Sequence, residues 1–169
     1  MNISTKNEKF TLKMATSNDA ELIVQFINKL AKFQKMEQTT TVTPERIKRL
    51  LDNNLAEVVL GYYEETPVAF SYFHQRSSAF TGRSGLYIDN FLIDDSMRGK
   101  GLGNIMFQFL SKYAVDSGCE LLEWGCLDWN KKAIEFYEKQ GAYCIDIMKI
   151  YRLSPEKLLE NGSLFLTKE

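Results

Sequence analysis

The sequence has few residues of the kinds that crosslink a chain or hold a metal. Its 169 residues include three cysteines and one histidine. The cysteines, Cys119, Cys126 and Cys144, are odd in number and form no Cys-x-x-Cys pair, so neither a disulfide framework nor a zinc site is expected. His74 lies in an aromatic run and is interpreted as a partly buried strand residue. We therefore expect no metal and a reducing, cytoplasmic location.

Long apolar runs and an excess of one charge are also absent. No segment approaches the ~20 apolar residues that span a bilayer, and no signal peptide is recognisable, so no membrane association is expected. The 21 basic and 22 acidic side chains give a formal net charge of -1. Without a basic stripe, a nucleic-acid partner is not expected. The length and the hydrophobic content of 44% suit one α/β domain over residues 1–169, with a loose tail after about residue 161.

Hydrophobic periodicity predicts helices and strands along the whole chain. Strands are predicted over residues 8–14, 58–63, 68–73, 87–93, 121–126 and 143–152. Helices are predicted over residues 18–30, 43–51, 102–117, 130–140 and 154–161. Asn18 and Glu21 are interpreted as a capping box for the first helix, and residues 64–67 as the turn of an antiparallel hairpin. The segments 34–42 and 75–85 are predicted to be surface loops.

A glycine-rich stretch, Arg98-Gly99-Lys100-Gly101-Leu102-Gly103, joins the predicted strand over 87–93 to the next helix. Glycines let the backbone approach an anion closely, and the first turn of a helix offers unpaired N–H groups and a positive dipole end. The expected ligand is a phosphate or pyrophosphate. The spacing fits neither a P-loop nor the full dinucleotide fingerprint, and a glycine-rich turn without a ligand stays open at this point.

A second motif follows the strand predicted over 121–126. It opens with Asn130 at a helix N-cap position and closes with Gly141 just past the helix end. Ala133 and Tyr137 share one helix face with Asn130. With the order of the elements, the two motifs resemble the GCN5-related N-acetyltransferase (GNAT) family over nearly the whole chain. This resemblance implies a single-domain fold, a mixed central sheet flanked by helices on both faces, and acetyl-CoA as the co-substrate, without a metal.

The resemblance also assigns roles to particular residues. The backbone of Phe91, Leu92 and Ile93 would meet the pantetheine arm and the acetyl carbonyl, and the glycine-rich stretch would hold the pyrophosphate. The full set implied to bind acetyl-CoA comprises Phe91, Leu92, Ile93, Arg98, Gly99, Lys100, Gly101, Leu102, Gly103, Asn104, Asn130, Ala133 and Tyr137.

Two side chains are the candidates for proton transfer. Asp89, on the strand near the implied cofactor, is the candidate base that takes a proton from the amine, through a water molecule because its side chain is short. Tyr137 is the candidate acid for the departing thiolate. A solvated or capping carboxylate for Asp89, and a packed core tyrosine for Tyr137, remain the alternatives.

Two further segments, residues 30–37 and 87–92, resemble the diamine, or spermidine/spermine, N-acetyltransferases. The residues implied to line the amine site are Phe33, Gln34, Asp89, Glu123 and Trp124, with a core-facing Trp124 as the alternative. Gln34 and Asp89 stand where those enzymes carry glutamates, and Arg76 and Lys35 add positive charge. A long polyamine needs negative surroundings, whereas Arg76 and Lys35 could pair with the carboxylate of a lysine-like amino acid.

The expected function is acetyl-CoA-dependent transfer of an acetyl group to a primary amine of a small molecule, either diamine-like, polyamine-like or lysine-like. Acetylation of protein N-termini or lysines, and a non-catalytic acyl-CoA-binding sensor module, are the alternatives. The family resemblance further implies a homodimer.

Overall fold

The computed structural model describes residues 2–145 and 150–164. The chain separates into two compact units, Met1–Gly125 and Cys126–Glu169, which are described in turn. Among the residues described, the first unit contains the sheet, and the second contains two helices. No helix among the described residues is both long and apolar enough to cross a membrane.

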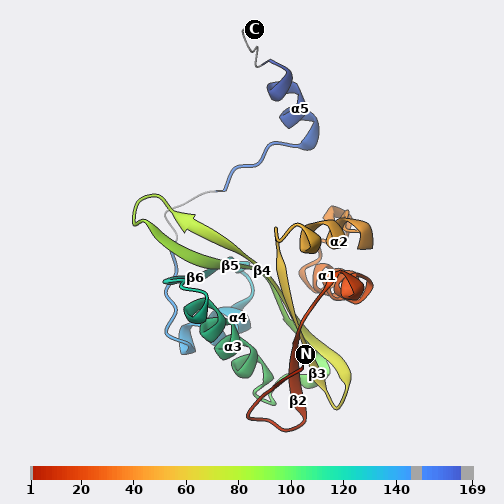
Figure 1. Ribbon diagram of the computed structural model, residues 1–169, viewed down its shortest axis with the longest axis vertical. Helices are drawn as coiled ribbons and strands as arrows, with labels where there is room; N and C mark the ends of the chain where they lie inside the picture. The colour runs from red at the N-terminus through yellow and green to blue at the C-terminus, as the bar shows by residue number, and fades with distance from the viewer. Residues whose placement is uncertain (1, 146–149, 165–169) are drawn as a thin grey trace. The chain divides into compact units, whose positions relative to one another are not determined.

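The first unit is built on a six-stranded sheet in which the strands follow one another in sequence order (Figure 1). The strands are β1 (Asn2–Ser4), β2 (Phe10–Met14), β3 (Glu57–Tyr63), β4 (Thr66–Ser78), β5 (Arg83–Ile93) and β6 (Leu121–Trp124). All neighbouring pairs are antiparallel except β5 and β6, which are parallel. The sheet is therefore mixed, as predicted.

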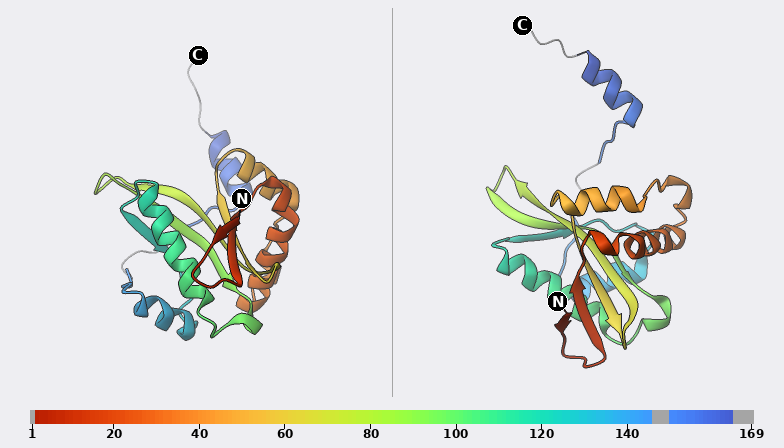
Figure 2. Two further views of the ribbon diagram at one scale, coloured as in Figure 1. Left: turned by 60° about the horizontal axis from the view of Figure 1, so that its bottom comes forward. Right: turned by 45° about the vertical axis from the view of Figure 1, so that its right-hand side comes forward.

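Helices lie on both faces of this sheet (Figure 2). α1 (Ala20–Gln34) and α2 (Pro44–Asp52) cover one face, and α3 (Leu102–Asp116) covers the other. α3 is the crossover that a parallel β5–β6 pair requires. Three short 3-10 helices complete the unit: η1 (Ser17–Asp19), η2 (Glu37–Thr39) and η3 (Asp95–Met97).

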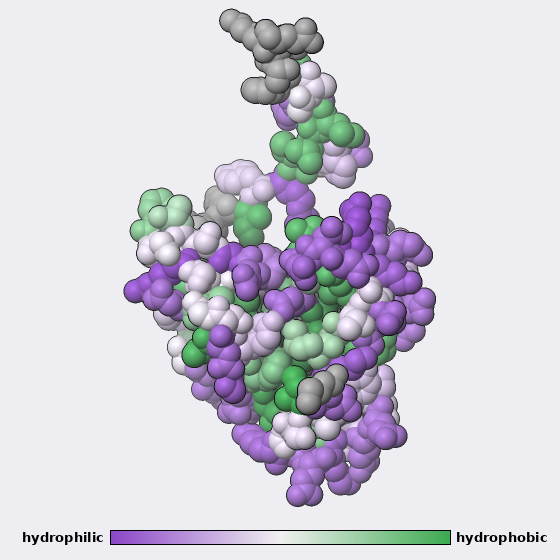
Figure 3. Space-filling view, viewed as in Figure 1, coloured by the Kyte–Doolittle hydropathy of each residue, from purple (hydrophilic) through white to green (hydrophobic). Residues whose placement is uncertain are grey.

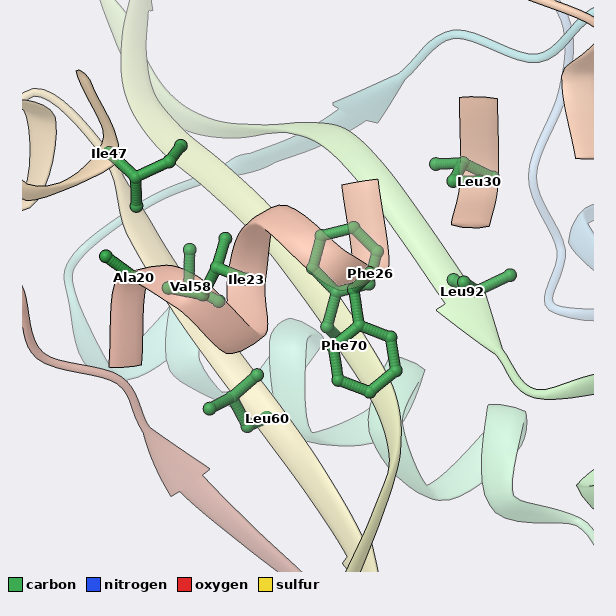
Figure 4. Packing of buried hydrophobic residues seen from close by; sticks show 9 residues of the cluster. All are labelled: Ala20, Ile23, Phe26, Leu30, Ile47, Val58, Leu60, Phe70 and Leu92. Atoms are coloured by element: carbon green, nitrogen blue, oxygen red, sulfur yellow. The ribbon is translucent and has the colours of Figure 1, made fainter. Parts of the chain in front are cut away.

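One core lies between α1, α2 and the sheet (Figure 4). Its fully buried members are Ala20, Ile23, Phe26, Leu30, Ile47, Val58, Leu60, Phe70 and Leu92. The rings of Phe26 and Phe70 stack with centroids 5.2 Å apart. Each such side chain contributes about 1.5–3 kcal/mol when it is withdrawn from water. The outward face of α2 is hydrophilic (Figure 3), so its single buried residue, Ile47, anchors it.

The second core lies between α3 and the opposite face of the sheet. Phe107 of α3 meets Trp124 edge-on at 5.1 Å and Phe91 at 6.4 Å. Farther along α3, Tyr113 contacts the ring of Phe73 and donates a hydrogen bond to Glu57. These contacts fix the sheet from both sides, and they hold β5 and β6 at the positions where the candidate site lies.

Several predicted local structures are confirmed. Thr43 caps α2 by accepting a hydrogen bond from the Arg46 N–H at 3.3 Å. The hairpin between β3 and β4 turns at Glu64 and Glu65, whose φ values of 46° and 68° belong to the left-handed region that a two-residue hairpin turn uses.

The first helix is capped two residues earlier than predicted. Thr16 and Asp19 form the capping box: the Thr16 N–H donates to Asp19 Oδ2 at 2.9 Å, and the box leads through η1 into α1. The assignment of Asn18 and Glu21 to this role was wrong, because Asn18 already lies within η1. Thr16 with Asp19 and Asn18 with Glu21 have the same three-residue spacing, so the sequence fits a capping box at either position.

The prediction of a surface loop over 75–85 is also wrong. β4 runs on to Ser78 and β5 begins at Arg83, so this segment is a β-ribbon that projects from the sheet. Its residues are mostly polar because most of them are exposed, and the sequence therefore lacks the apolar alternation that marks a half-buried strand. Gly85 is required there, since a Cβ would lie 2.8 Å from Leu121 Cβ.

The second unit contains α4 (Lys131–Lys139) and α5 (Pro155–Ser163). α4 begins with the predicted cap, Asn130, and α5 begins with a cap at Ser154, the first residue of the helix predicted over 154–161. The side-chain oxygens of both caps accept backbone N–H groups at 3.3 Å. Gly141 follows α4 with a φ of 86°, as predicted for a C-terminal glycine.

The strand predicted over 143–152 is not formed in its described residues, 143–145 and 150–152; residues 146–149 lie outside the described part. Tyr143, Ile150 and Tyr151 are at least 85% exposed, and no strand is present among the described residues of this unit to pair with them. A strand without a partner has no ladder to stabilise it. Of the tail predicted to be loose, α5 includes residues up to Ser163, and residues 165–169 lie outside the described part.

Candidate active site

β5 and β6 are paired along only part of β5. The parallel register joins Gly85–Ile88 to Leu121–Trp124, where β6 ends, while β5 continues to Ile93. No strand of the first unit pairs with this far edge of β5 beyond Ile88. Phe91, Leu92 and Ile93 lie on this stretch, so their backbone offers an edge along which an extended ligand could bind as a strand does.

A β-bulge interrupts β5 at the same place. Tyr72 faces Asn90 and Phe73 faces Ile88, so Asp89 is the extra residue without a partner in β4. A bulge bends a strand and re-aims its side chains. The buried hydroxyl of Ser71 donates to the Asn90 carbonyl at 2.9 Å. Ser71 is the one fully buried polar side chain of the described core, and it holds the bulge in place.

The predicted base, Asp89, is exposed at this bulge. Burial raises the pKa of the neighbouring Tyr72, and the negative charge of Asp89 raises it further. A neutral phenol therefore lies near an accessible carboxylate. Sequence analysis missed both Tyr72 and Ser71, because a single tyrosine or serine in an apolar strand carries no pattern of its own.

The glycine-rich stretch forms an open turn at the start of α3. Gly99 and Gly101 have φ values of 79° and 76°, in the left-handed region that favours glycine. A Cβ on either would meet no atom within 4 Å, so space above the turn is open. Gly101 is the N-cap of α3, and the N–H groups of Leu102 and Gly103 in its first turn have no intrahelical acceptor. The turn thus fits a phosphate group.

Ion pairs and contacts between cations and aromatic rings hold the side chains around the turn. Lys29 pairs with Asp94 at 2.5 Å, and Arg98 pairs with Asp95 at 2.6 Å. The Arg98 guanidinium also lies over the Phe33 ring, 5.0 Å from its centroid. Phe33, predicted to line the amine site, is therefore placed against the turn. Asn104 is exposed on the first turns of α3, and Lys100 Nζ lies 5.0 Å from the Tyr63 centroid.

The other predicted amine-site residues fall on two faces of the sheet. Glu123 is the register partner of Tyr87, and Trp124 that of Ile88, so their side chains point to opposite faces. Trp124 packs on Phe107, on the α3 face.

Glu123 instead forms an ion pair with Arg76 at 3.3 Å. Because this ion pair lies beside Tyr87, charge of both signs lies on that face of the sheet. The remaining predicted residue, Gln34, ends α1, and Lys35 follows it in the left-handed conformation, with a φ of 57°.

The second unit carries the other candidate residues on α4. Asn130 accepts the Ala133 N–H and thereby sets the start of the helix. Tyr137, one helical turn beyond Ala133, is half-buried. Burial raises the pKa of its phenol, and the nearby Cys126 thiol adds to the shift when it is ionised. The phenol therefore keeps its proton at neutral pH, as a proton donor must.

The architecture and motifs agree with a known protein family. Residues 24–142 match the model of the Acetyltransferase (GNAT) family. The chain belongs to the GNAT family. It is thus an acetyl-CoA-dependent N-acetyltransferase, as predicted from the two motifs.

Similar enzymes narrow the branch of this family. The GNAT chain is 29% identical over 131 residues to a thialysine N-epsilon-acetyltransferase of Caenorhabditis elegans, covering 78% of this chain and 81% of the relative. It is 32% identical over 115 residues to the L-ornithine N5-acetyltransferase NATA1 of Arabidopsis thaliana, covering 68% and 47%. A human spermidine/spermine N(1)-acetyltransferase-like protein 1 is 23% identical over 168 residues, covering 92% and 24%. The predicted similarity to the diamine acetyltransferase branch is confirmed.

Solved structures share the fold. An aminoglycoside acetyltransferase from an uncultured soil metagenomic sample matches with a TM-score of 0.76 at 17% identity, over 88% of this chain and 99% of that one. A possible acetyltransferase from Clostridium difficile matches with a TM-score of 0.71 at 21% identity, over 87% and 99%. The GNAT fold predicted from the sequence is thereby confirmed.

Proposed function

We propose that this N-acetyltransferase acetylates the side-chain amine of a small amino acid of the lysine or ornithine type, in preference to a long polyamine. The observation that carries this proposal is the mixed charge around Tyr87, where Arg76 lies beside Glu123. A polyamine presents only cations and favours acidic surroundings. An amino acid presents both charges. Two relatives named for thialysine and ornithine support the same choice.

Asp89 is proposed as the group that deprotonates the amine. An alkyl amine has a pKa near ~10 and carries a proton at neutral pH, so it becomes a nucleophile only after a base removes that proton. The exposed carboxylate of Asp89 accepts it directly or through one water molecule. The bulge supports this role because it turns Asp89 out of the regular ladder, and Ser71 fixes the bulge from within the core.

Acetyl-CoA supplies the acetyl group. Gly99, Gly101 and the first turn of α3 would hold its pyrophosphate through backbone N–H groups, with Arg98 and Lys100 adding charge. The unpaired edge of β5 from Phe91 to Ile93 would bind the pantetheine arm.

Asn130 and Ala133 are further residues proposed to bind acetyl-CoA, and Tyr137 would donate its phenolic proton to the departing thiolate. The raised pKa keeps the phenol protonated at neutral pH. It also makes transfer to a thiolate, whose conjugate acid has a pKa near ~8.5, uphill, so the proposal for Tyr137 rests on its place one helical turn beyond Ala133 on α4.

A substrate panel tests the proposal. Release of free thiol from acetyl-CoA would be followed with lysine, ornithine, 1,5-diaminopentane and spermidine, and the amines ranked by kcat/KM. We expect an amino acid to rank first, and Asp89→Asn to lower kcat for every amine. A tenfold preference for spermidine, equivalent to ~1.4 kcal/mol, would contradict the amino-acid assignment.

The same assay separates the remaining alternatives. Acetyl-CoA binding without turnover of any amine would favour a sensor module, and turnover only with peptides would favour protein acetylation. The homodimer and the cytoplasmic location stay predictions, and sedimentation of the purified chain tests the first of them.

A further inference from the structure

An ion pair and an aromatic ring form a compact cluster on the face of the sheet that carries Tyr72, the tyrosine whose phenol lies near Asp89. Arg76 Nη1 lies 3.3 Å from Glu123 Oε2, and the Arg76 guanidinium lies over the Tyr87 ring at 5.5 Å from its centroid. His74 flanks the same ring at 5.6 Å. The register aligns His74, Tyr87 and Glu123 across three neighbouring strands, so these side chains share one face.

The Arg76–Glu123 pair is loose and accessible. Its contact of 3.3 Å is longer than the ~2.8 Å of a strong charge-assisted bond, and the two side chains are 38% and 27% exposed. An arginine can donate two parallel hydrogen bonds to a carboxylate, and a shortest contact of 3.3 Å is longer than such bonds. Both side chains are therefore accessible to a ligand without a conformational change that exposes them.

A zwitterion is the ligand that complements this pair. The α-carboxylate of an amino acid matches the guanidinium of Arg76, and the α-ammonium matches the carboxylate of Glu123. The face of the Tyr87 ring attracts a cation as well. Neither a diamine nor a simple carboxylate satisfies both partners.

The distance along β5 suits the length of a lysine side chain. Tyr87 and Asp89 are two residues apart on the strand, which corresponds to at most roughly 7 Å across the bulge. The Cα and the terminal nitrogen of an extended lysine are separated by five bonds, or about 6 Å. A head group held beside Tyr87 therefore brings the terminal amine to the bulge at Asp89.

We propose that Arg76 and Glu123 form the head-group site for the α-carboxylate and α-ammonium of the acceptor amino acid, above Tyr87. This inference rests on the proposed function, and it names the two side chains that would set its specificity. Arg76 selects for the carboxylate, and Glu123 selects for the α-amine.

Three amines of equal chain length separate the two contributions. Lysine carries both head-group charges, 1,5-diaminopentane lacks the carboxylate, and 6-aminohexanoate lacks the α-amine. For the unaltered enzyme we expect kcat/KM to be highest for lysine, by about tenfold or more over each of the others. Arg76→Gln should lower kcat/KM about tenfold or more for lysine and 6-aminohexanoate, and should not lower it for 1,5-diaminopentane. Glu123→Gln should lower it for lysine and 1,5-diaminopentane, and spare 6-aminohexanoate.

Arg83→Gln is the matched control. Arg83 pairs with Glu120 at the same distance of 3.3 Å, on the same ribbon, but Arg83 is outside the cluster. This variant should retain the lysine preference. Unchanged acetyl-CoA affinity in all variants, measured by calorimetry, would show that the fold is intact.

The outcomes distinguish the inference from the proposed function. If the enzyme acetylates the amines but Arg76→Gln and Glu123→Gln affect all three alike, the head-group site is wrong and the proposed function stands. If no amine is acetylated, both are wrong.

Discussion

Removing the Ser71 hydroxyl should weaken both the fold and the chemistry. Ser71 is fully buried, and its hydroxyl donates to the Asn90 carbonyl at 2.9 Å, beside the bulged Asp89. Ser71→Ala deletes that donor inside the core. Loss of a buried hydrogen bond typically costs about 1–3 kcal/mol, and we expect the free energy of unfolding in urea to fall by that amount.

The same change should reach the active site, because the bulge aims Asp89. We expect kcat at saturating acetyl-CoA to fall several-fold, and the affinity for acetyl-CoA to be unchanged. Ser111→Ala is the control: its hydroxyl donates to the Phe107 carbonyl at 3.0 Å within α3, where alanine is a good helix former. If Ser71→Ala has the same free energy of unfolding and the same kcat as the unaltered enzyme, the proposed role of this hydrogen bond is refuted.

Three further changes test separate parts of the account. Gly101→Val should abolish acetyl-CoA binding in calorimetry, because its φ of 76° favours glycine and a side chain would fill the open space above the turn. Gly82→Val is the control: at a φ of 66° in the hairpin turn it introduces similar strain and should leave binding intact. Tyr137→Phe should lower kcat by ~10²-fold with little change in the KM for acetyl-CoA, and an unchanged kcat would make Tyr137 a packing residue. Burial and a hydrogen bond raise the pKa of Tyr113 to about 12. The contribution of the protonated phenol to stability is complete below pH ~10 and is lost as the pH rises toward 12. Between these pH values, the free energy of unfolding should therefore fall more steeply for the unaltered protein than for Tyr113→Phe.

The sequence was most informative where one residue type meets a backbone requirement. The positive φ values of Gly99, Gly101 and Gly141 follow from the freedom of glycine, and the cap at Asn130 follows from its side-chain oxygen. Such local rules need no knowledge of distant contacts. Together they located the turn at α3 and the boundaries of α4.

Features that depend on strand pairing could not be predicted. The bulge at Asp89 exists only relative to β4, and the Arg76–Glu123 pair joins residues on β4 and β6 that flank β5. The prediction of a loop over 75–85 was wrong for a related reason, because an exposed pair of strands needs no apolar face. The strand predicted over 143–152 had the right composition, but composition alone supplies no partner.

The position of the acetyl group on lysine is the most direct test of the central claim. The enzyme would be incubated with acetyl-CoA and lysine, and the product analysed by tandem mass spectrometry. A head group held by Arg76 and Glu123, with the terminal amine at Asp89, predicts acetylation of the side-chain nitrogen alone. Acetylation of the α-nitrogen would contradict the account, because it would place the opposite end of the substrate at the bulge.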